Sequence, residues 1–321
     1  MIDNIVIGGF IMKWHFILLI VIGSLLILGL LISYICFRIV FYQDRNKNKP
    51  TEEFELPPGD IYLEHKEIMF KWMKEARNII YEKVQITSFD NLKLVGKYYE
   101  CGKDNIIEIM FHGYRGKAER DLCGGIQRAF ALNHNVLIVN QRTSGESEGS
   151  VISFGINERK DCLSWIDLIN KKFNNPKIIL CGISMGAATV LMASNMNLPN
   201  NVIGILADCS YSSQKEIIMK CIKDLHLPPK LFYPFIKFGA KLFGHFNLEE
   251  TSPIQAIKDS NIPTILFHGT TDDFVPCYMS EKLYAEKPEN AKLVTIPNAG
   301  HGLCYLIDSE LYIKSLKEFF L

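Results

Sequence analysis

The chain has 321 residues, of which 48% are hydrophobic and 22% are charged. This length allows one large domain or two small ones, and the proportions are those of an ordinary globular protein. The 35 basic and 35 acidic side chains cancel, so the charge balance predicts no nucleic-acid partner. Nothing in the composition implies a protein partner.

One stretch near the N-terminus departs from this composition. Residues 16–37 contain no charged side chain, and about 20 apolar residues in a helix suffice to cross a bilayer. We therefore predict one transmembrane helix over about 16–37, within an N-terminal segment 1–43. A signal peptide and a buried soluble helix are the alternatives, but the run is long, ends without a small-x-small cleavage site and lacks a polar face. Met12 offers an alternative start to Met1.

The charges around this run predict its orientation. Four basic residues follow it closely, namely Arg38, Arg45, Lys47 and Lys49. Only Lys13 and the terminal amine precede it, so the positive-inside rule places the C-terminal side in the cytoplasm. Eight of the nine cysteines follow the run without paired spacing, which is typical of reduced thiols rather than a disulfide framework. We expect a single-pass membrane protein whose large domain faces the cytoplasm.

A polar linker and a hairpin are predicted next. Residues 44–60 are polar and contain three prolines, as linkers do. The domain then covers 61–321 and begins with a helical pattern over 61–81. Two alternating apolar and polar runs, 83–89 and 92–99, flank a turn pair and predict an antiparallel hairpin.

From residue 106 onward, short apolar runs alternate with helical patterns. The strands are predicted at 106–111, 136–140, 178–181, 202–207, 264–267 and 292–296, and the helices at 120–132, 157–173, 185–196, 279–286 and 311–320. This alternation indicates a mostly parallel sheet with helices on both faces. Reactive groups in such sheets lie beyond the carboxyl ends of the strands.

A long insertion interrupts this alternation. Residues about 212–260 separate two of the strands, and a structureless loop of that length would be unusual. We expect a small helical cap over the site, with a packing excursion that has no substrate role as the alternative. Four aromatic residues of this insertion are candidates for a hydrophobic substrate pocket: Phe232, Tyr233, Phe235 and Phe238.

The sequence Gly182-Ile183-Ser184-Met185-Gly186 follows an apolar strand and precedes small residues suited to a helix. This is the G-x-S-x-G pattern in the strand, turn and helix context that it requires. The two glycines allow close packing on either side of a strained serine. The N-terminus of the helix that follows faces the place where negative charge develops. Ser184 is therefore the candidate nucleophile, and a simple glycine-bounded turn is the alternative.

A serine hydroxyl needs a base that a third group orients. Two later loops, each directly after a predicted strand, supply Asp272 and His301. Ser184, Asp272 and His301 follow one another in the chain in the order serine, aspartate, histidine. Catalytic triads whose serine stands on a strand–turn–helix element have this order. We expect Ser184 to attack, His301 to move the proton and Asp272 to orient His301. Asp208, at the end of another strand, is the alternative acid.

An acyl-transfer site also needs donors for the oxyanion. The backbone N–H of Met185, directly after the nucleophile, is one candidate. The loop after the 106–111 strand reads His112-Gly113-Tyr114-Arg115-Gly116, and the backbone N–H of Tyr114 is the second candidate. We expect His112 to hold this loop rather than to act as a base.

Taken in order, the motifs HGYRG, GISMG, HGTTDDFVP and NAGHG resemble those of the α/β-hydrolase superfamily. The loop Asn140 to Gly149 with Ile152-Ser153-Phe154-Gly155 resembles a bacterial branch called serine aminopeptidase-like or acylglycerol-lipase-like, which includes membrane-anchored members. The resemblance covers residues 83–321, and its aspartate and histidine fall on Asp272 and His301. Asn140 and Thr143-Ser144 depart from the family's usual residues there. The resemblance implies an α/β-hydrolase fold with an eight-stranded, mostly parallel sheet.

Together these features predict a membrane-anchored serine hydrolase that cleaves a carboxylic ester through an acyl-enzyme. The anchor and the aromatic insertion favour a small-molecule or lipid-like acyl substrate. No metal and no cofactor are expected. A peptidase, amidase or thioesterase on the same fold remains open, as does a catalytically idle membrane-bound module that binds a ligand.

Overall fold

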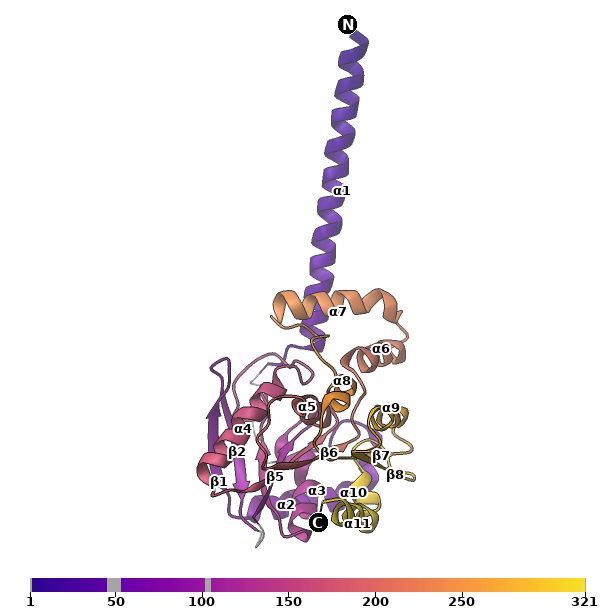
Figure 1. Ribbon diagram of the computed structural model, residues 1–321. Helices are drawn as coiled ribbons and strands as arrows, with labels where there is room; N and C mark the ends of the chain where they lie inside the picture. Colours follow the sequence, from indigo (N-terminus) through magenta and orange to yellow (C-terminus); the bar gives the residue numbers. More distant parts are fainter. Residues whose placement is uncertain (1, 45–52, 102–104, 321) are drawn as a thin grey trace.

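The computed structural model describes residues 2–44, 53–101 and 105–320, with side chains from residue 14 onward (Figure 1). The predicted linker falls partly on residues 45–52, which lie outside the described ranges. Three of the basic residues used to predict the orientation, Arg45, Lys47 and Lys49, are among them.

The centre of the domain is an eight-stranded sheet with the order β1-β2-β4-β3-β5-β6-β7-β8. Its strands are β1 Glu82–Thr87, β2 Lys93–Tyr99, β3 Ile106–Phe111, β4 Asn135–Val139, β5 Lys177–Ile183, β6 Val202–Asp208, β7 Thr264–Gly269 and β8 Ala291–Ile296. The pairs β1–β2 and β2–β4 are antiparallel and the other five are parallel. Residues of β3, β4 and β7 are buried throughout, as expected where helices cover both faces of a parallel sheet.

Helices cover both faces of this sheet. Their bounds are α2 Lys66–Asn78, α3 Ala118–Ala131, α4 Glu158–Lys172, α5 Met185–Ala193, α9 Tyr278–Glu286, α10 Cys304–Ile307 and α11 Ser309–Phe320. One apolar layer joins the sheet to Trp165 of α4, Val190 of α5 and Leu283 of α9. The other joins it to Ile126 of α3 and Tyr312 of α11. The predicted alternation of strands and helices is therefore confirmed.

One predicted helix differs in its first part. Instead of one helix over 61–81, a 3-10 helix covers Asp60–His65 and α2 follows it. Tyr62 of the short helix is buried together with Met69 and Met73 of α2. Burial of Tyr62 under the loop of His301, whose carbonyl accepts its hydroxyl, accounts for the separate first turn.

The segment between β6 and β7 contains three helices, α6 Gln214–Asp224, α7 Pro229–Phe243 and α8 Pro253–Asp259. Ser213 caps α6 and Ser252 caps α8, each through a hydrogen bond from a backbone N–H in the first turn. Helices α6 and α7 lie above the carboxyl-end edge of the sheet, while α8 packs on α5 (Figure 1).

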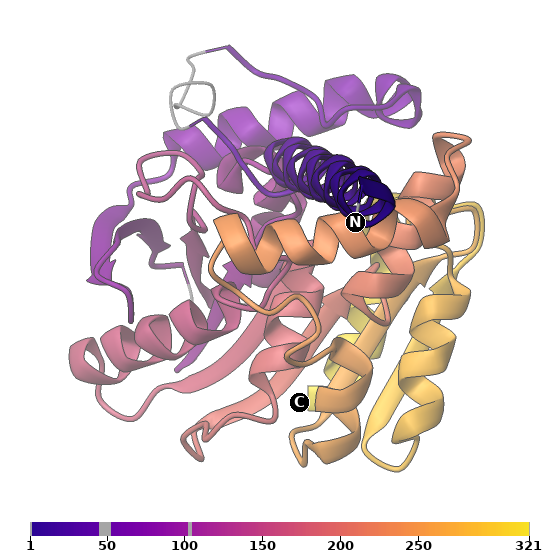
Figure 2. The same cartoon turned by 90° about the horizontal axis from the view of Figure 1, so that it is seen from above.

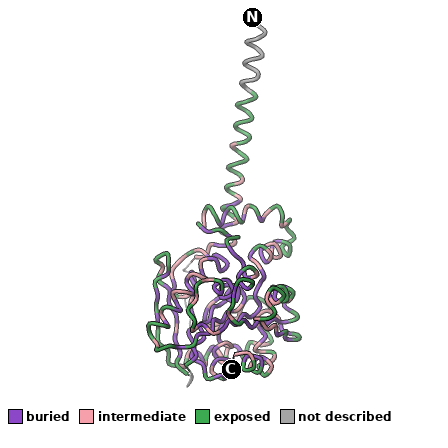
Figure 3. The backbone as a smooth tube through the Cα atoms, viewed as in Figure 1, coloured by how far each residue is buried: buried purple, intermediate pink, exposed green. Residues whose placement is uncertain are grey.

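Helix α1, Ile2–Val40, projects from the domain as one long rod (Figures 1 and 3). Its part Trp14–Val40 is long and apolar enough to cross a membrane, and only 6% of the most hydrophobic window is buried. Its last turns differ from the rest because Ser33 and Phe37 are buried, as is Phe41 directly after the helix. The base of α1 packs against α7, which crosses it (Figures 1 and 2).

Candidate active site

Ser184 stands at the sharp turn between β5 and α5. Its backbone has φ 56° and ψ −118°, a conformation in which a residue with a side chain is strained. A Cβ on Gly182 would clash with the backbone of Gly186, and one on Gly186 would clash with Phe111. The two glycines thus allow β5 and α5 to approach closely enough to hold Ser184 in this conformation.

The structure brings Ser184, His301 and Asp272 together at the carboxyl ends of β5, β7 and β8. His301 Nε2 lies 2.9 Å from Ser184 Oγ, and His301 Nδ1 lies 2.7 Å from Asp272 Oδ2. Ser184 is 7% exposed, and the His301 side chain is 13% exposed. The arrangement therefore forms a nearly buried chain of two hydrogen bonds.

The surroundings of Asp272 keep its carboxyl group ionised. Burial alone would raise the pKa of Asp272, but hydrogen bonds from His268, His301 and the Val275 N–H lower this pKa to about 2. Oδ1 also accepts the backbone N–H of Phe274 at 3.0 Å. A carboxylate only accepts hydrogen bonds, so the Nδ1–H group of His301 donates a hydrogen bond to Asp272 and keeps its proton. Nε2 is then free to accept the hydroxyl proton of Ser184.

His268 positions this carboxylate from the preceding strand. Its Nε2 lies 3.4 Å from Asp272 Oδ2 and 2.7 Å from the carbonyl oxygen of Val275. Its Nδ1 accepts the hydroxyl of Ser280 at 2.6 Å. No sequence pattern assigns a role to His268, although it stands in the same HGTTDD stretch as Asp272.

Asp208, the alternative acid, lies elsewhere in the hydrogen-bond network. Its Oδ2 accepts the hydroxyl of Tyr312 at 3.0 Å, and burial raises the pKa of Asp208. Its backbone carbonyl accepts the N–H of Ser184 at 2.8 Å. Asp208 therefore supports the serine turn through its main chain.

A buried thiol lies next to the histidine. Cys209 Sγ is 4.0 Å from His301 Nε2, and Cys209, Asp272 and His301 offer three possible metal ligands within 4.8 Å of one another. Burial and the nearby carboxylates raise the pKa of Cys209 well above its usual value, so it remains a neutral thiol. Because Asp272 and His301 already engage these atoms in hydrogen bonds, we assign no metal to this group.

The loop of His112 to Gly116 lies directly beside Ser184. A Cβ on Gly113 would be 3.5 Å from the Cβ of Ser184, so the next residue, Tyr114, is adjacent to the serine. Met185 is the first residue of α5, and N–H groups at a helix start have no partner within the helix. Tyr114 directly follows Gly113 and Met185 directly follows Ser184, so their main-chain N–H groups remain the candidate donors for the oxyanion.

His112 holds this loop from within. Its Nδ1–H donates to the Gly113 carbonyl at 2.9 Å, and its Nε2 accepts the N–H of Gln141 at 3.1 Å. The Gln141 side chain donates back to the His112 carbonyl at 2.6 Å, and Ser144 Oγ donates to the Gly116 carbonyl at 2.8 Å. The loop after β4 therefore braces the loop beside Ser184, a role that the sequence analysis missed.

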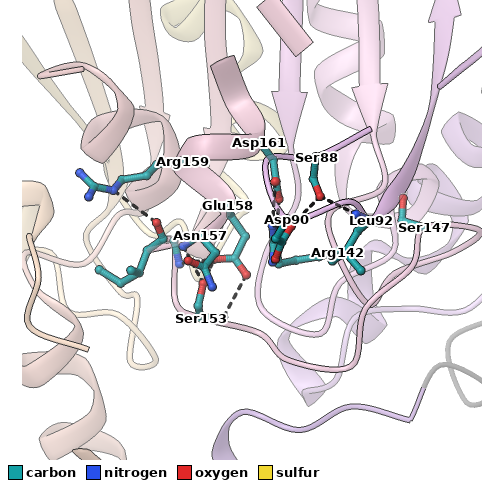
Figure 4. Close-up of polar contacts among 12 residues, drawn as sticks. Ser88, Asp90, Leu92, Arg142, Ser147, Ser153, Asn157, Glu158, Arg159 and Asp161 are labelled. Carbon is teal, nitrogen blue, oxygen red and sulfur yellow. Dashed lines mark hydrogen bonds and ion pairs between the residues drawn. The ribbon is translucent and has the colours of Figure 1, made fainter. Parts of the chain in front are cut away.

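Charged side chains hold the loop between β4 and α4, which contains Gln141 and Ser144, in place (Figure 4). Arg142 donates two hydrogen bonds to Asp161, at 2.8 and 2.7 Å, and another to Asp90 at 3.0 Å. Glu158 accepts the N–H groups of Ser153 and Gly155, each at 2.9 Å. Bidentate pairing of an arginine with a carboxylate is directional as well as strong. The loop from β4 to α4 is thereby held at both ends.

The end of α1 contacts the same site from above. The Tyr114 hydroxyl donates to the Val40 carbonyl at 2.7 Å, and Arg115 donates to the Ile39 carbonyl at 2.7 Å. Phe154 packs between Tyr114 and Phe41, with ring centroids 5.1 and 5.7 Å away. The apolar helix is thus joined to the loop beside Ser184, which no local sequence pattern indicates.

An apolar cluster extends from Ser184 toward α1 and α7. It includes Met185, Phe154 and Tyr211 near the serine, and Phe37 and Phe41 at the base of α1. These residues are buried, and Met185 directly follows the candidate nucleophile in the chain.

The four candidate pocket residues do not share one face of α7. Tyr233 and Phe232 join the apolar cluster, and the Tyr233 hydroxyl donates to Glu249 at 2.9 Å. Phe235 packs toward Gly29 of α1, while Phe238 is 47% exposed. Only Phe232 and Tyr233 therefore face the same cluster as Met185.

Comparison with known proteins gives relatives without an assigned activity. No protein-family model matches the chain. Protein YqkD of Bacillus subtilis is 29% identical over 59% of this chain, and the matched part is 62% of YqkD, less than two thirds of its length. Protein Rv2307c of Mycobacterium tuberculosis is 28% identical over 78% of this chain and 89% of its own.

Several solved structures resemble this chain. Pyrococcus furiosus esterase Pf2001 is 21% identical, has a TM-score of 0.63 and covers 85% of this chain and 98% of its own. The α/β hydrolase GrgF of Penicillium sp. sh18 is 14% identical, with a TM-score of 0.59, and the match covers 75% of this chain and 98% of GrgF. Acylaminoacyl peptidase of Pyrococcus horikoshii is 15% identical, with a TM-score of 0.57, and the match covers 77% of this chain and 43% of the peptidase. With the strand order described above, these likenesses show that the chain has the α/β-hydrolase fold.

Proposed function

We propose that the protein is a membrane-anchored serine hydrolase that cleaves a carboxylic ester through an acyl-enzyme. The observation that carries this proposal is the chain of hydrogen bonds from Ser184 Oγ to His301 Nε2 and from His301 Nδ1 to Asp272 Oδ2. This is the geometry that an activated serine needs. The neighbouring esterase and peptidase structures agree with hydrolysis, and their identities support the fold alone.

Each residue then has one role in the reaction. Ser184 attacks the ester carbonyl while His301 takes its proton, and Asp272 stabilises the resulting imidazolium. The N–H groups of Tyr114 and Met185, with the positive end of α5, stabilise the oxyanion. His301 then returns the proton to the leaving alcohol, and a water molecule that His301 activates hydrolyses the acyl-enzyme.

Two features support a hydrophobic substrate and a membrane location. Met185 beside Ser184 belongs to the apolar cluster that also includes Phe37 and Phe41 at the base of α1, so the nucleophile has apolar surroundings on the side of the anchor. Burial of these two aromatic residues in the domain favours an anchor that stays attached over a signal peptide that is removed. We propose that the domain faces the cytoplasm, and the absence of any disulfide among the nine cysteines agrees with this orientation.

The test is labelling of the full chain, in detergent, with a fluorophosphonate probe beside Ser184→Ala. Labelling of the native chain alone supports the nucleophile. p-Nitrophenyl esters of increasing chain length then test the acyl preference, and matched amides and thioesters test the peptidase and thioesterase alternatives. Activity that disappears as the acyl chain lengthens would contradict a hydrophobic substrate. A folded native chain that does not label would instead indicate a catalytically idle binding module.

A further inference from the structure

The outer surface of α7 carries an exposed apolar stripe. At 3.6 residues per turn, Leu231, Phe235, Phe238 and Leu242 fall on one side of this helix. Leu231, Phe238 and Leu242 are 58%, 47% and 42% exposed. A row of large apolar side chains on a solvent-facing helix marks a docking surface.

The contacts between α7 and α1 determine the direction in which this stripe faces. A Cβ on Gly239 would be in contact with the backbone of Ser33, which places the crossing of the two helices there. Phe235 instead reaches Gly29, where a Cβ would lie 3.9 Å from its ring. Gly29 is about one turn, or roughly 5 Å, further along the projecting part of α1. The stripe therefore faces the direction in which α1 leaves the domain (Figure 1).

The apolar part of α1 beyond α7, which begins after Lys13, is about as long as one hydrocarbon layer is thick. From Trp14 to Ser33 the helix has about 20 residues, or roughly 30 Å, which is the thickness of a bilayer core. Side chains such as Leu25 and Ile27 are 62% and 68% exposed in this part, whereas Ser33 is buried. A bilayer that covers the exposed part of α1 would thus end at the level of α7.

Three lysines lie beside the apolar stripe. Lys230, Lys237 and Lys241 are exposed and share a side of α7 roughly 110° from the stripe, between the stripe and the buried Tyr233. Lys237 also pairs with Glu249. An apolar stripe flanked by lysines is the pattern of a helix in the membrane interface, where lysine stems follow acyl chains and ammonium groups reach the headgroups.

We propose that α7 lies in the interface of the bilayer that α1 crosses. Its apolar stripe contacts acyl chains, and its lysines lie among the headgroup phosphates. This proposal rests on the membrane anchoring proposed above. With two crossing helices in contact with the membrane (Figure 2), the domain is held with the carboxyl-end edge of its sheet, and hence Ser184, toward the bilayer.

Photocrosslinking of the full chain in phosphatidylcholine–phosphatidylglycerol liposomes tests this placement. Phe238→p-benzoyl-phenylalanine is irradiated, and lipid adducts are measured by mass spectrometry. The matched control is the same substitution at Ile80, which is 92% exposed and precedes β1 at the edge of the sheet opposite Ser184. We expect phospholipid adducts at position 238 at least tenfold above those at position 80. Leu231 provides a second position on the stripe if the Phe238 variant does not fold.

The outcomes separate this proposal from the one on which it rests. Adducts to a second copy of the chain, or equal lipid adducts at both positions, would overturn an interfacial α7. A chain that resists alkaline carbonate extraction but gives no lipid adduct at position 238 or 231 overturns it while the anchor stands. A chain that carbonate removes from the liposomes overturns the anchor itself, and α7 in the interface with it.

Discussion

The hydroxyl of Tyr114 donates a hydrogen bond of 2.7 Å to the carbonyl oxygen of Val40, the last residue of α1. Carbonyl groups in the last turn of a helix have no partner within the helix, and Tyr114 and Arg115 supply partners for Val40 and Ile39. Tyr114 is also the residue whose backbone N–H we propose for the oxyanion. The apolar helix therefore supports the loop beside Ser184 directly, in addition to any role as an anchor.

Tyr114→Phe removes this hydrogen bond and keeps the ring. We expect kcat for p-nitrophenyl ester hydrolysis to fall by about fivefold, which corresponds to roughly 1 kcal/mol for one hydrogen bond, with KM nearly unchanged. Steady-state kinetics of the full chain measure both constants. Tyr81→Phe is the control, because Tyr81 packs on Tyr99 at the other edge of the sheet. An equal fall in both variants would show that the loss of the Val40 contact is not the cause.

Asp272→Asn and Asp208→Asn distinguish the two acids. Asparagine at position 272 would favour the wrong tautomer of His301, and we expect kcat to fall by about 10⁴-fold, the size seen when a triad aspartate is so replaced. Asp208→Asn keeps the main-chain carbonyl that accepts the Ser184 N–H, so a fall of less than about tenfold is expected. The reverse ranking of the two variants would assign the acid to Asp208.

Gly186→Ala tests the close packing behind the nucleophile. The added Cβ would clash with the carbonyl of Phe111 in the neighbouring strand, and overpacking of this kind costs about 1–3 kcal/mol or more. We expect a lower unfolding temperature together with loss of fluorophosphonate labelling. The matched control is Gly23→Ala, where a Cβ would have no neighbour within 4 Å. Unchanged stability and labelling in Gly186→Ala would refute this account of the turn.

Much of the fold followed from local patterns in the sequence, because apolar runs and helical spacing report directly on burial in an α/β sheet. The chain positions of Ser184, Asp272 and His301 at strand ends also predicted that they would meet, since carboxyl ends of parallel strands share one edge. Contacts between distant segments were beyond such reasoning. The apolar residues of α1 look alike in the sequence, and nothing local singles out Phe37 and Phe41 as the ones that the domain buries.

The faces of α7 illustrate the same limit. Its aromatic residues suggested one pocket, but the position of α1 divides them, so that Phe232 and Tyr233 face the apolar cluster while Phe238 faces outward. His268 and Gln141 were missed for a related reason. Each acts by positioning another residue, and single histidines or glutamines in loops give no sequence signal for such contacts.

The pKa of Asp272 predicts how stability changes with pH. Its folded-state pKa of about 2 lies below the ordinary value of 3.8, so folding favours the ionised form. The resulting stabilisation, about 2 kcal/mol, is complete above about pH 5 and is lost as the pH falls toward 2. The difference in unfolding temperature between the native chain and Asp272→Asn should therefore narrow from pH 6 to pH 3. A gap that stays constant over this range would contradict the lowered pKa.

Phe41→Ala tests whether the end of α1 belongs to the domain. The Phe41 side chain is fully buried and contacts Phe37, Phe154 and Phe246, so its removal leaves a cavity, and we expect a loss of about 3–5 kcal/mol in the free energy of unfolding. Because Phe154 also packs on Tyr114, ester hydrolysis should fall along with the unfolding temperature. The control is Phe89→Ala, since Phe89 is 50% exposed and its truncation opens no buried cavity. If Phe41→Ala were as stable and as active as Phe89→Ala, α1 would be a tether only, and a chain without it should fold and react normally.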